Sequence, residues 1–564
     1  MRLLLLLSAA LAVTGCATVP SATTTPASAT RGMVSAADPR AAEAGAEMLR
    51  AGGSAADAVL ATLIALTVVE PQSSGIGGGS FLLYDDGRSG PRSYDSRETA
   101  PAAATPTWFF VDGQALPIGQ AIPTGRSVGV PGNLRQVALV HRQHGKLPWA
   151  RLFGPAIRLA RDGFTITPRT FEMLGSNPAT GALTPEGRAL FYGEDGKPKP
   201  VGTLVRNPAL ASFLERLAAG GADAFYRGEN ADRIVATVTR APRHPAPMTA
   251  ADLAGYAAKE RPPVCGTYRV YRICGMGPPS SGATTVFATL KMLERFDLTA
   301  LGPDSPTSWH LIAESMRLAY ADRDKYLADS DFVPVPVAGL IDPGYLGRRS
   351  ALIAPDRTMA TVTAGTPAGA VTAAVPRAQV ENGTSHLVAV DRRGEVATVT
   401  STIESIFGSG LMVNGYYLNN ELTDFNLTPT LNGIDTANRV QGGKRPRSSM
   451  SPTIVYGPDG RPRLAVGAAG GATIPAQVLK AIIAVLDWKM SAQGAIALPV
   501  IFAPGDTVFV ERGTSLEAMA PQLQALGHKV SVRSPSFKAN AIEWVNGRPV
   551  GAADPRSEGV AVSE

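Results

Sequence analysis

A glycine–threonine pair, Gly383 and Thr384, opens a stretch whose residues alternate as they do in a β-strand. A threonine hydroxyl is a weak nucleophile unless a base lies beside it, and an N-terminal threonine carries that base as its own α-amine. An unperturbed α-amine has a pKa of about 7.7–8.0, which suits proton transfer near neutral pH. The amine of Thr384 exists only after the chain breaks. We therefore predict self-cleavage, in which the hydroxyl attacks the Gly383 carbonyl and the resulting ester is hydrolysed.

The elements that would position Thr384 follow from the spacing around it. A first strand is predicted over residues 384–391, a three-residue loop ends at Gly394, and a second strand runs to Thr402. Pairing the strands across this loop places Thr384 opposite Thr402, with Cβ atoms about 4.5–5.5 Å apart. Glu404 lies two residues further along the same face. The hairpin therefore predicts part of a site from spacing alone.

Three later segments carry groups that could complete such a site: Glu421 and Asp424 beside two asparagines, the pair Ser448-Ser449, and the pair Gly470-Gly471. Each segment taken alone is also typical of ordinary structure. Asp424 could cap a turn, the serines could belong to a polar loop, and the glycines could let a helix pack closely. The glycine run at 75–80 resembles a phosphate-binding loop, but a strand follows it where a dinucleotide site requires a helix. We expect these glycines to permit tight backbone packing beside a pocket.

Taken in order, these segments resemble the γ-glutamyltransferase family, N-terminal-nucleophile hydrolases that cleave themselves into a large and a small subunit. The resemblance runs from about Arg31 almost to the C-terminus. The further matching motifs are Ser96-Arg97-Glu98-Thr99-Ala100-Pro101, Ala160-Arg161-Asp162-Gly163-Phe164, Pro279-Ser280-Ser281-Gly282, Ala321-Asp322-Arg323 and Ala553-Asp554-Pro555-Arg556-Ser557.

The resemblance implies a role for each matching residue. Thr384 would be both the cleavage residue and the nucleophile, and Thr402 would support it. Arg97 would hold the α-carboxylate of a γ-glutamyl group, because a planar guanidinium suits a carboxylate. Ser448 and Ser449 would help Arg97 to bind this carboxylate. Glu404, Glu421 and Asp424 would bind the α-ammonium. The N–H groups of Gly470 and Gly471 would form the oxyanion hole.

The family also implies the architecture and the reaction. The expected fold is α/β (α+β), a four-layer αββα sandwich built jointly by a large subunit, 32–383, and a small catalytic subunit, 384–564. The implied substrates are glutathione or other γ-glutamyl compounds, with water, an amino acid or a peptide as acceptor and with no metal or organic cofactor. Two alternatives are a related acylase, acting on a β-lactam such as a cephalosporin or on poly-γ-glutamate, and a non-catalytic binding lipoprotein with the same fold.

Two departures from the family pattern bear on specificity. Glu404 stands where many members have asparagine. Residues 426–443 occupy the place of the loop that covers the pocket, but the segment is shorter than in lidded members, longer than in lidless ones, and contains no tyrosine. The preferred acceptor, and the balance between hydrolysis and transfer, therefore stay open.

The N-terminus is typical of an exported lipoprotein. The apolar run at 3–13 is about half the length that spans a bilayer, which favours a signal peptide over residues 1–15. Val13-Thr14-Gly15-Cys16 resembles a bacterial lipobox, in which Cys16 would be acylated. The alternative is an ordinary signal peptide with an incidental cysteine. Residues 16–31 are rich in Thr, Ala, Pro and Ser and predict a flexible tether. We expect an extracytoplasmic, lipid-anchored protein, and Ala17 favours the outer membrane.

Composition narrows the function classes. The chain has 564 residues, 45% of them hydrophobic, and a formal net charge of only +6 without a Lys/Arg tract, which argues against nucleic-acid binding. Its six histidines form no convincing metal cluster. In an oxidising compartment Cys265 and Cys274 could pair, since a hairpin centred on residues 269–270 would bring them face to face. Arg-Val is a poor two-residue turn, however, so the free and paired states both stay open.

Self-cleavage gives the first prediction. Denaturing gels and intact-mass analysis of the purified protein should show two fragments, the smaller beginning at Thr384. A Thr384→Ala protein should stay whole, because no hydroxyl is left to attack the Gly383 carbonyl. A folded parent that also stays whole would contradict the prediction and favour the binding protein.

Overall fold

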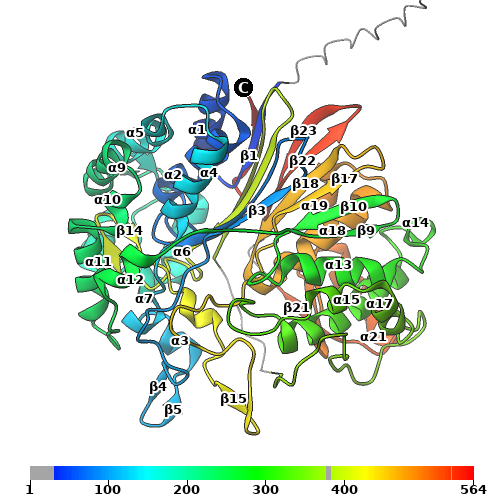
Figure 1. Ribbon diagram of the computed structural model, residues 1–564. Coiled ribbons are helices and arrows are strands. Elements are labelled where there is room, and N and C mark those ends of the chain that lie inside the picture. The colour runs from blue at the N-terminus through cyan, green and yellow to red at the C-terminus, as the bar shows by residue number, and fades with distance from the viewer. Residues whose placement is uncertain (1–30, 376–382, 535–536) are drawn as a thin grey trace, which may run out of the picture.

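Two β-sheets packed face to face form the centre of the molecule, and helices cover the outer side of each sheet (Figure 1). The computed structural model describes residues 31–375, 383–534 and 537–564. The predicted signal peptide, Cys16 and almost all of the tether lie outside the described residues. Four layers, αββα, were expected from the family resemblance, and this prediction is confirmed.

The first sheet has seven strands, and the predicted nucleophile lies at the start of one of its central strands. Strands that precede Thr384 in the sequence and strands that follow it both contribute to this sheet, and β1 lies between β24 and β11. The order is β24 (Val560–Ser563), β1 (Met33–Ala36), β11 (Ser385–Val390), β12 (Val396–Thr402), β2 (Gly79–Asp85), β3 (Arg92–Asp95) and β8 (Lys259–Arg261).

The second sheet has six strands and packs on the first, with β18 contacting both β11 and β12. Its order is β23 (Arg548–Ala553), β22 (Lys538–Val545), β18 (Pro462–Ala469), β17 (Thr453–Tyr456), β10 (Tyr271–Gly275) and β9 (Val264–Tyr268).

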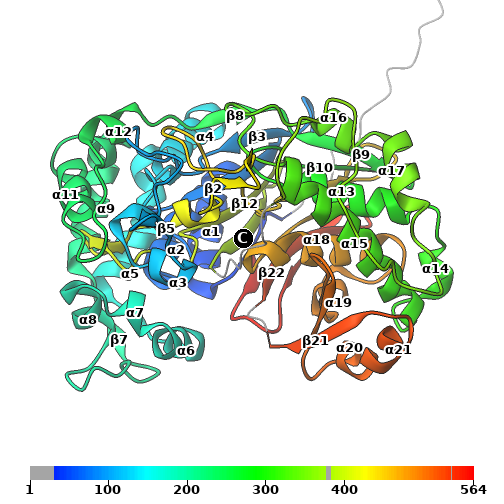
Figure 2. The same cartoon turned by 90° about the horizontal axis from the view of Figure 1, so that it is seen from below.

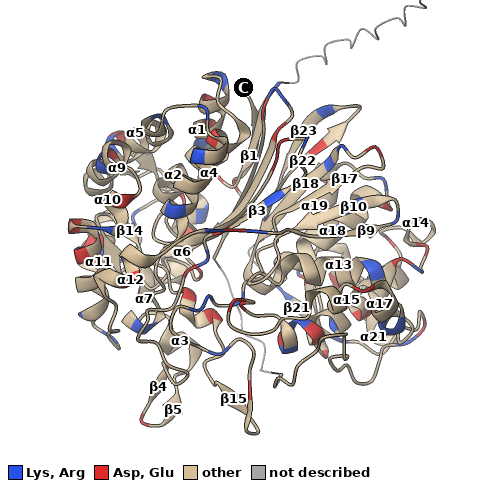
Figure 3. Ribbon diagram, in the orientation of Figure 1, with Lys and Arg blue, Asp and Glu red and all other residues tan. Residues whose placement is uncertain are grey.

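The helices form two groups on opposite sides of the sheets (Figure 2). Beside the first sheet lie α1 (Pro39–Arg50), α2 (Ala55–Val69), α4 (Asn133–His144), α5 (Gly154–Asp162) and α9 (Pro208–Gly220). Beside the second sheet lie α13 (Gly282–Leu293), α15 (Pro306–Tyr326), α17 (Pro343–Ser350), α18 (Ile474–Leu486) and α19 (Ala492–Ala497). In Figure 3 basic and acidic residues are interspersed over both groups.

Local sequence signals account for several of these elements. The capping box of Ser54 with Asp57 starts α2, which ends just before Pro71. Helices predicted over 41–49, 156–161, 208–217, 309–326 and 475–486 are confirmed as α1, α5, α9, α15 and α18. No helix among the residues described here has the length and apolar character needed to cross a membrane.

Strand β11 is buried on both faces, and its side chains alternate between the two layers. Leu387 and Ala389 join the apolar cluster beneath α2, whereas Val388 and Val390 join the cluster between the sheets. The period of two puts Thr384 on the same side as Val388, facing the second sheet. The nucleophile therefore faces the sheet that carries the Gly470-Gly471 turn.

The register of the central hairpin agrees with the spacing argument. Asp391 donates its N–H to the Glu395 carbonyl at 3.1 Å, and Ser385 pairs with Ser401. One step further, this register sets Thr384 opposite Thr402, as predicted. Gly394, with φ at +81°, provides the left-handed residue of the loop.

The glycine run at 75–80 packs as tightly as predicted. A Cβ atom on Gly78 would lie 1.9 Å from the Thr402 carbonyl oxygen, and one on Gly77 would lie 2.1 Å from the Tyr417 carbonyl oxygen. Distances this short exclude any side chain at these two positions. The run therefore lets the backbone approach the segments that carry the site.

Cys265 and Cys274 form a disulfide across the β9–β10 hairpin. The unfavourable Arg-Val turn forms because Arg269 adopts a left-handed φ of +55° and long-range contacts hold its guanidinium. Arg269 donates to the Asp487 carboxylate at 2.9 Å and to the Glu294 carbonyl at 2.8 Å. Tertiary contacts thus override the weak local signal.

The packing between the sheets gives a second prediction. A Cβ on Gly467 would meet the buried His386 ring at 2.2 Å. Gly467→Ala should lower the free energy of unfolding by about 1–3 kcal/mol, the usual cost of overpacking. Denaturant unfolding of this variant should be compared with Gly255→Ala, where an added Cβ meets nothing within 4 Å. Equal stability of the two variants would show that the sheets can separate to admit a methyl group.

Candidate active site

The Thr384 hydroxyl lies against the peptide bond that it is predicted to cleave. It donates to the Gly383 carbonyl, and its oxygen lies 3.4 Å from the Thr402 hydroxyl oxygen. Thr402 donates to the same carbonyl at 3.0 Å and accepts from the Glu404 N–H at 2.8 Å. Thr402 thus polarises the carbonyl that Thr384 approaches. This arrangement suits an N-to-O acyl shift.

His386 is two residues from Thr384, but its ring is occupied elsewhere. Its nitrogens contact the Thr400 and Thr398 hydroxyl oxygens at 2.8 and 3.1 Å. Burial lowers the pKa of His386 to about 3, so the ring is neutral at physiological pH. His386 therefore packs between the sheets and is not the base for Thr384.

The Gly470-Gly471 turn connects β18 to the helix layer of the second sheet. Both residues have left-handed φ values, +124° and +56°. Gln477 donates to the Ala469 carbonyl at 2.7 Å, and the Thr473 hydroxyl donates to the Gly470 carbonyl at 2.7 Å. These bonds fix the carbonyls of the turn.

Two contacts place this turn beside the start of β11. Gly467, three residues before Gly470, covers His386. Lys538 pairs with Ala469 in the sheet, and its Nζ lies 3.3 Å from the Ser385 hydroxyl. The residues predicted as nucleophile and oxyanion hole therefore lie in one region.

Arg97 is buried and joined to both carboxylates that were predicted to bind an ammonium. Its guanidinium forms ion pairs with Glu421 and Asp424, in the short 3-10 turn η3 (Glu421–Asp424). It also donates to the Pro446 and Arg447 carbonyls at 3.1 and 3.0 Å. The predicted carboxylate binder and two of the predicted ammonium binders thus pair with one another.

Glu404 lies between the nucleophile and the charged group formed by Arg97, Glu421 and Asp424. Its carboxylate accepts hydrogen bonds from Ser405 and Asn420. Its φ is +74°, a strained value for a non-glycine residue. The contacts with Thr402 and Asn420 hold Glu404 between the nucleophile and the η3 turn. The sequence did not single out Asn420 for this role.

Ser448 and Ser449 lie next to the segment that binds Arg97, where two of the matching motifs contact them. The Ser448 carbonyl accepts from the Ser281 N–H at 2.8 Å, and Arg323 donates to the Ser449 hydroxyl at 2.6 Å. These serines follow directly after the carbonyls that hold Arg97. The predicted catalytic and substrate-binding residues thus lie in segments that hydrogen bonds, ion pairs and strand pairing connect to one another.

Comparisons with known proteins identify the family of this chain. A family profile described as Gamma-glutamyltranspeptidase matches residues 41–563. The chain is 36% identical over 547 residues to the glutathione hydrolase proenzyme of Bacillus subtilis (strain 168), covering 94% of this chain and 91% of the relative. The chain belongs to the gamma-glutamyltranspeptidase family. Its relatives mark it as an enzyme of the γ-glutamyltranspeptidase or glutathione hydrolase type.

The family also includes acylases close to this chain. The acylase ACY 1 proenzyme of Pseudomonas sp. (strain SE83) is 35% identical over 553 residues, covering 95% of this chain and 94% of the relative. The crystal structure of cephalosporin acylase from Bacillus halodurans superposes with a TM-score of 0.81 at 26% identity, covering 97% and 99% of the two chains. Overall similarity therefore leaves the substrate to be argued from the site.

Glu98 is a buried carboxyl group that the motif contains but sequence reasoning gave no role. Neither of its oxygens, nor Oε2 of Glu421, has a hydrogen-bond donor among the described residues. Burial raises the pKa of Glu98 to about 8 and also raises that of Glu421. The two carboxyls face each other, so a proton on one of them would turn the contact into a hydrogen bond. No local sequence signal reveals this pair.

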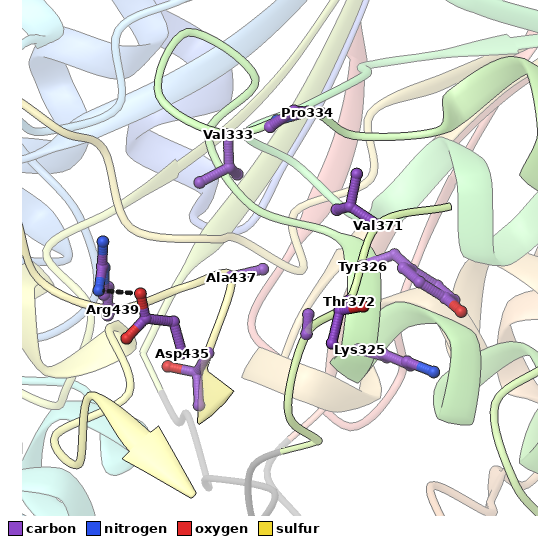
Figure 4. A pocket seen from close by; sticks show the side chains of 11 residues that line it. Lys325, Tyr326, Val333, Pro334, Val371, Thr372, Asp435, Ala437 and Arg439 are labelled. Carbon is purple, nitrogen blue, oxygen red and sulfur yellow. Dashed lines mark ion pairs between the residues drawn. The ribbon is translucent and has the colours of Figure 1, made fainter. Parts of the chain in front are cut away.

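The segment in the family's lid position lies beside the site and beside the chain that precedes the cleavage point. Within it, Asn438 donates to the Asp424 carbonyl at 2.7 Å. Ala374 donates its N–H to the Asp435 carbonyl at 3.0 Å. A cavity of about 170 Å³ separates the segment from the end of α15, with Arg439 and Asp435 paired on one wall and Lys325 and Tyr326 on the other (Figure 4). No predicted site residue lines this cavity.

Within the described ranges, no group of three or more His, Cys, Asp or Glu side chains could hold a metal ion.

The raised pKa of Glu98 gives a third prediction. The folded state holds this proton up to a pH of about 8, whereas an unfolded glutamate loses it near its ordinary pKa of 4.5. This group's contribution to stability is therefore lost as pH rises from about 5 to 8. Glu98→Gln, which stays neutral, should gain at least about 1.4 kcal/mol relative to the parent over that range. Denaturant unfolding at several pH values should show the gain. The exposed control Glu172→Gln should not, and parallel pH curves for Glu98→Gln and the parent would contradict the assignment.

Proposed function

We propose that the protein is a self-processing γ-glutamyltransferase and glutathione hydrolase that acts through an ester on Thr384. The observation that carries this proposal is that two groups of residues occur in the same site. In the first, the Thr384 and Thr402 hydroxyls both donate hydrogen bonds to the Gly383 carbonyl. In the second, the buried Arg97 is paired with carboxylates. The first group supplies a nucleophile, and the second suits a zwitterionic amino-acid head.

Processing would begin with attack of the Thr384 oxygen on the Gly383 carbonyl carbon. The C–N bond breaks, its nitrogen takes the hydroxyl proton, and an ester joins Gly383 to Thr384. Water then hydrolyses the ester to a carboxylate at Gly383 and a free α-amine and hydroxyl at Thr384. The names of the relatives support this step, since they are called proenzymes.

Turnover would use the same hydroxyl with the new amine as its base. The amine takes the hydroxyl proton as the oxygen attacks the γ-carbonyl of the substrate. The N–H groups of Gly470 and Gly471 would stabilise the oxyanion, worth a few kcal/mol per donor in comparable sites. Collapse returns the proton to the leaving amine and leaves a γ-glutamyl ester. Water or the amine of an amino acid or peptide then attacks this ester.

Substrate binding would exchange ion pairs within the charged group. The α-carboxylate of the substrate would take up the Arg97 guanidinium, and its α-ammonium would pair with Asp424, Glu421 and Glu404. Each buried charge keeps a partner through this exchange, which limits the cost of desolvation. Glutathione meets these requirements because its γ-glutamyl group has a free α-amino acid head.

An acylase is the second candidate, and the relatives and the solved structure that carry that name favour it. The charged group argues against it, because one guanidinium cannot balance two ionised carboxylates, whereas an added α-ammonium would let both Glu421 and Asp424 ionise. A substrate without an ammonium would supply no cation for the second carboxyl.

We also propose that lipid on Cys16 anchors the protein outside the cytoplasm, facing the periplasm from the outer membrane. This proposal rests on the N-terminal sequence pattern alone. Metabolic labelling with a fatty acid, compared between the parent and Cys16→Ser, tests it.

Recognition of the amino-acid head gives the fourth prediction. The cleaved enzyme should hydrolyse γ-glutamyl-4-nitroanilide with a kcat/KM at least about 10-fold above that for glutaryl-4-nitroanilide, which lacks only the ammonium, since a charged hydrogen bond contributes about 1.5–3 kcal/mol. Arg97→Lys should lower kcat/KM for the γ-glutamyl substrate by about 10- to 100-fold, because it loses the bidentate contact but keeps the charge.

The matched control is Arg463→Lys, which alters a half-buried ion pair with Glu543 far from Thr384 in the sequence. Equal or greater activity on the glutaryl substrate would favour the acylase. A cleaved parent without activity on either substrate would contradict both enzymatic functions.

A further inference from the structure

A buried ion pair lies directly behind the residue that follows the nucleophile. The Lys538 Nζ donates to both carboxylate oxygens of Glu70 at 3.0 Å, and each side chain is only 2% exposed. The same Nζ donates to the Ser73 hydroxyl at 3.0 Å and lies 3.3 Å from the Ser385 hydroxyl oxygen. Ser385 in turn donates to Glu70 at 2.5 Å. Every polar group of this cluster has a partner, as a buried ion pair requires.

The cluster lies where three parts of the active site meet. Glu70 ends α2, Ser385 begins β11, and Lys538 begins β22. Lys538 pairs with Ala469, the residue before the Gly470-Gly471 turn. The ion pair therefore joins the strand of the nucleophile to the turn of the predicted oxyanion hole.

The turn that follows Glu70 extends this connection to the supporting residues. The Ser73 carbonyl accepts from the Ile403 N–H at 3.3 Å, and the Gln72 carbonyl accepts from the Phe407 N–H at 3.1 Å. Ile403 lies between Thr402 and Glu404. The residues around the ion pair thus also hold the segment that polarises the scissile carbonyl.

Cleavage changes what holds Thr384 in place. In the whole chain, Thr384 is tied covalently to Gly383. After cleavage it is a chain end, and chain ends fray unless side-chain or backbone contacts hold them. A nucleophile must keep its position within about 0.5 Å to react efficiently. Ser385 is the next residue, and its hydroxyl is bound on one side by Glu70 and on the other by Lys538.

We propose that Glu70 and Lys538 are positioning residues that hold Ser385, and through it the new N-terminal Thr384, in register with Thr402 and the Gly470-Gly471 turn. The role rests on the proposed function, because it matters only if Thr384 becomes a chain end that does chemistry. Neither residue is assigned to contact the substrate or the reacting atoms.

The decisive variant is Ser385→Ala, which leaves the ion pair intact and removes its connection to the strand. We expect a kcat for γ-glutamyl-4-nitroanilide at least 10-fold below that of the parent, with KM within threefold, because the Arg97 group is unchanged. The matched control is Ser35→Ala on the neighbouring strand β1. It also removes a buried hydroxyl, bonded to the Ala552 carbonyl at 2.7 Å, and should keep the parent's kcat.

Lys538→Met and Lys538→Arg test the cation itself. Lys538→Met should lower the kcat of the cleaved enzyme at least 10-fold, and Lys538→Arg should restore part of this kcat. The control is Lys480→Met in α18, which removes another buried ammonium, bonded to the Ile496 and Leu498 carbonyls. It should lower the thermal midpoint without changing KM or kcat more than twofold.

The outcomes separate the two proposals. A parent that stays whole and has no activity would overturn the proposed function and this role together. A parent that cleaves and turns over, with Ser385→Ala equal to it in kcat, would overturn the positioning role alone. The positioning role would also fail if Ser385→Ala and Ser35→Ala lose kcat equally, since the effect would then come from any lost buried hydroxyl.

Discussion

The pairing register of β11 with β12 is the constraint on which the site depends. It sets Thr384 opposite Thr402 and brings both hydroxyls to the Gly383 carbonyl. A slip of one residue would turn every side chain of β11 to the other face, and Thr384 would point at the helices. Burial of both faces opposes such a slip, since each face presents a different set of side chains to a different layer. The loop between the strands also fixes the register, because the Asp391 carboxylate accepts hydrogen bonds from the Arg393 and Glu395 N–H groups.

Charge balance is the second organising feature. Arg97 brings one positive charge into a region that contains Glu98, Glu421 and Asp424, all buried. Burial penalises each extra negative charge, which is why the pKa values of Glu98 and Glu421 are raised. This region thus holds more carboxyl groups than the single Arg97 guanidinium can balance. An incoming ammonium would supply a further cation, which is the physical basis of the proposed preference for an amino-acid head.

How far the sequence predicts this structure depends on the range of each interaction. The hairpin register, the capping box at Ser54 and the main helices follow from neighbouring residues, so local patterns predict them. The ion pairs of Arg97 join residues more than 300 positions apart. Only the family resemblance placed these residues in one site. Glu98 and the pair of Glu70 with Lys538 were not predicted. Charged residues are usually exposed, and no local sequence pattern identifies the few that the fold buries.

The strand order of the first sheet has a consequence for the processed protein. Strand β1 precedes Thr384 in the sequence, yet it lies between β24 and β11, which both follow Thr384. The strands of the two fragments of a cleaved chain are therefore interleaved in one sheet. Separating the fragments would break the hydrogen bonds between β1 and both of its neighbouring strands. Two such molecules in solution would not exchange halves. The two fragments that form each active site would therefore always come from the same precursor chain.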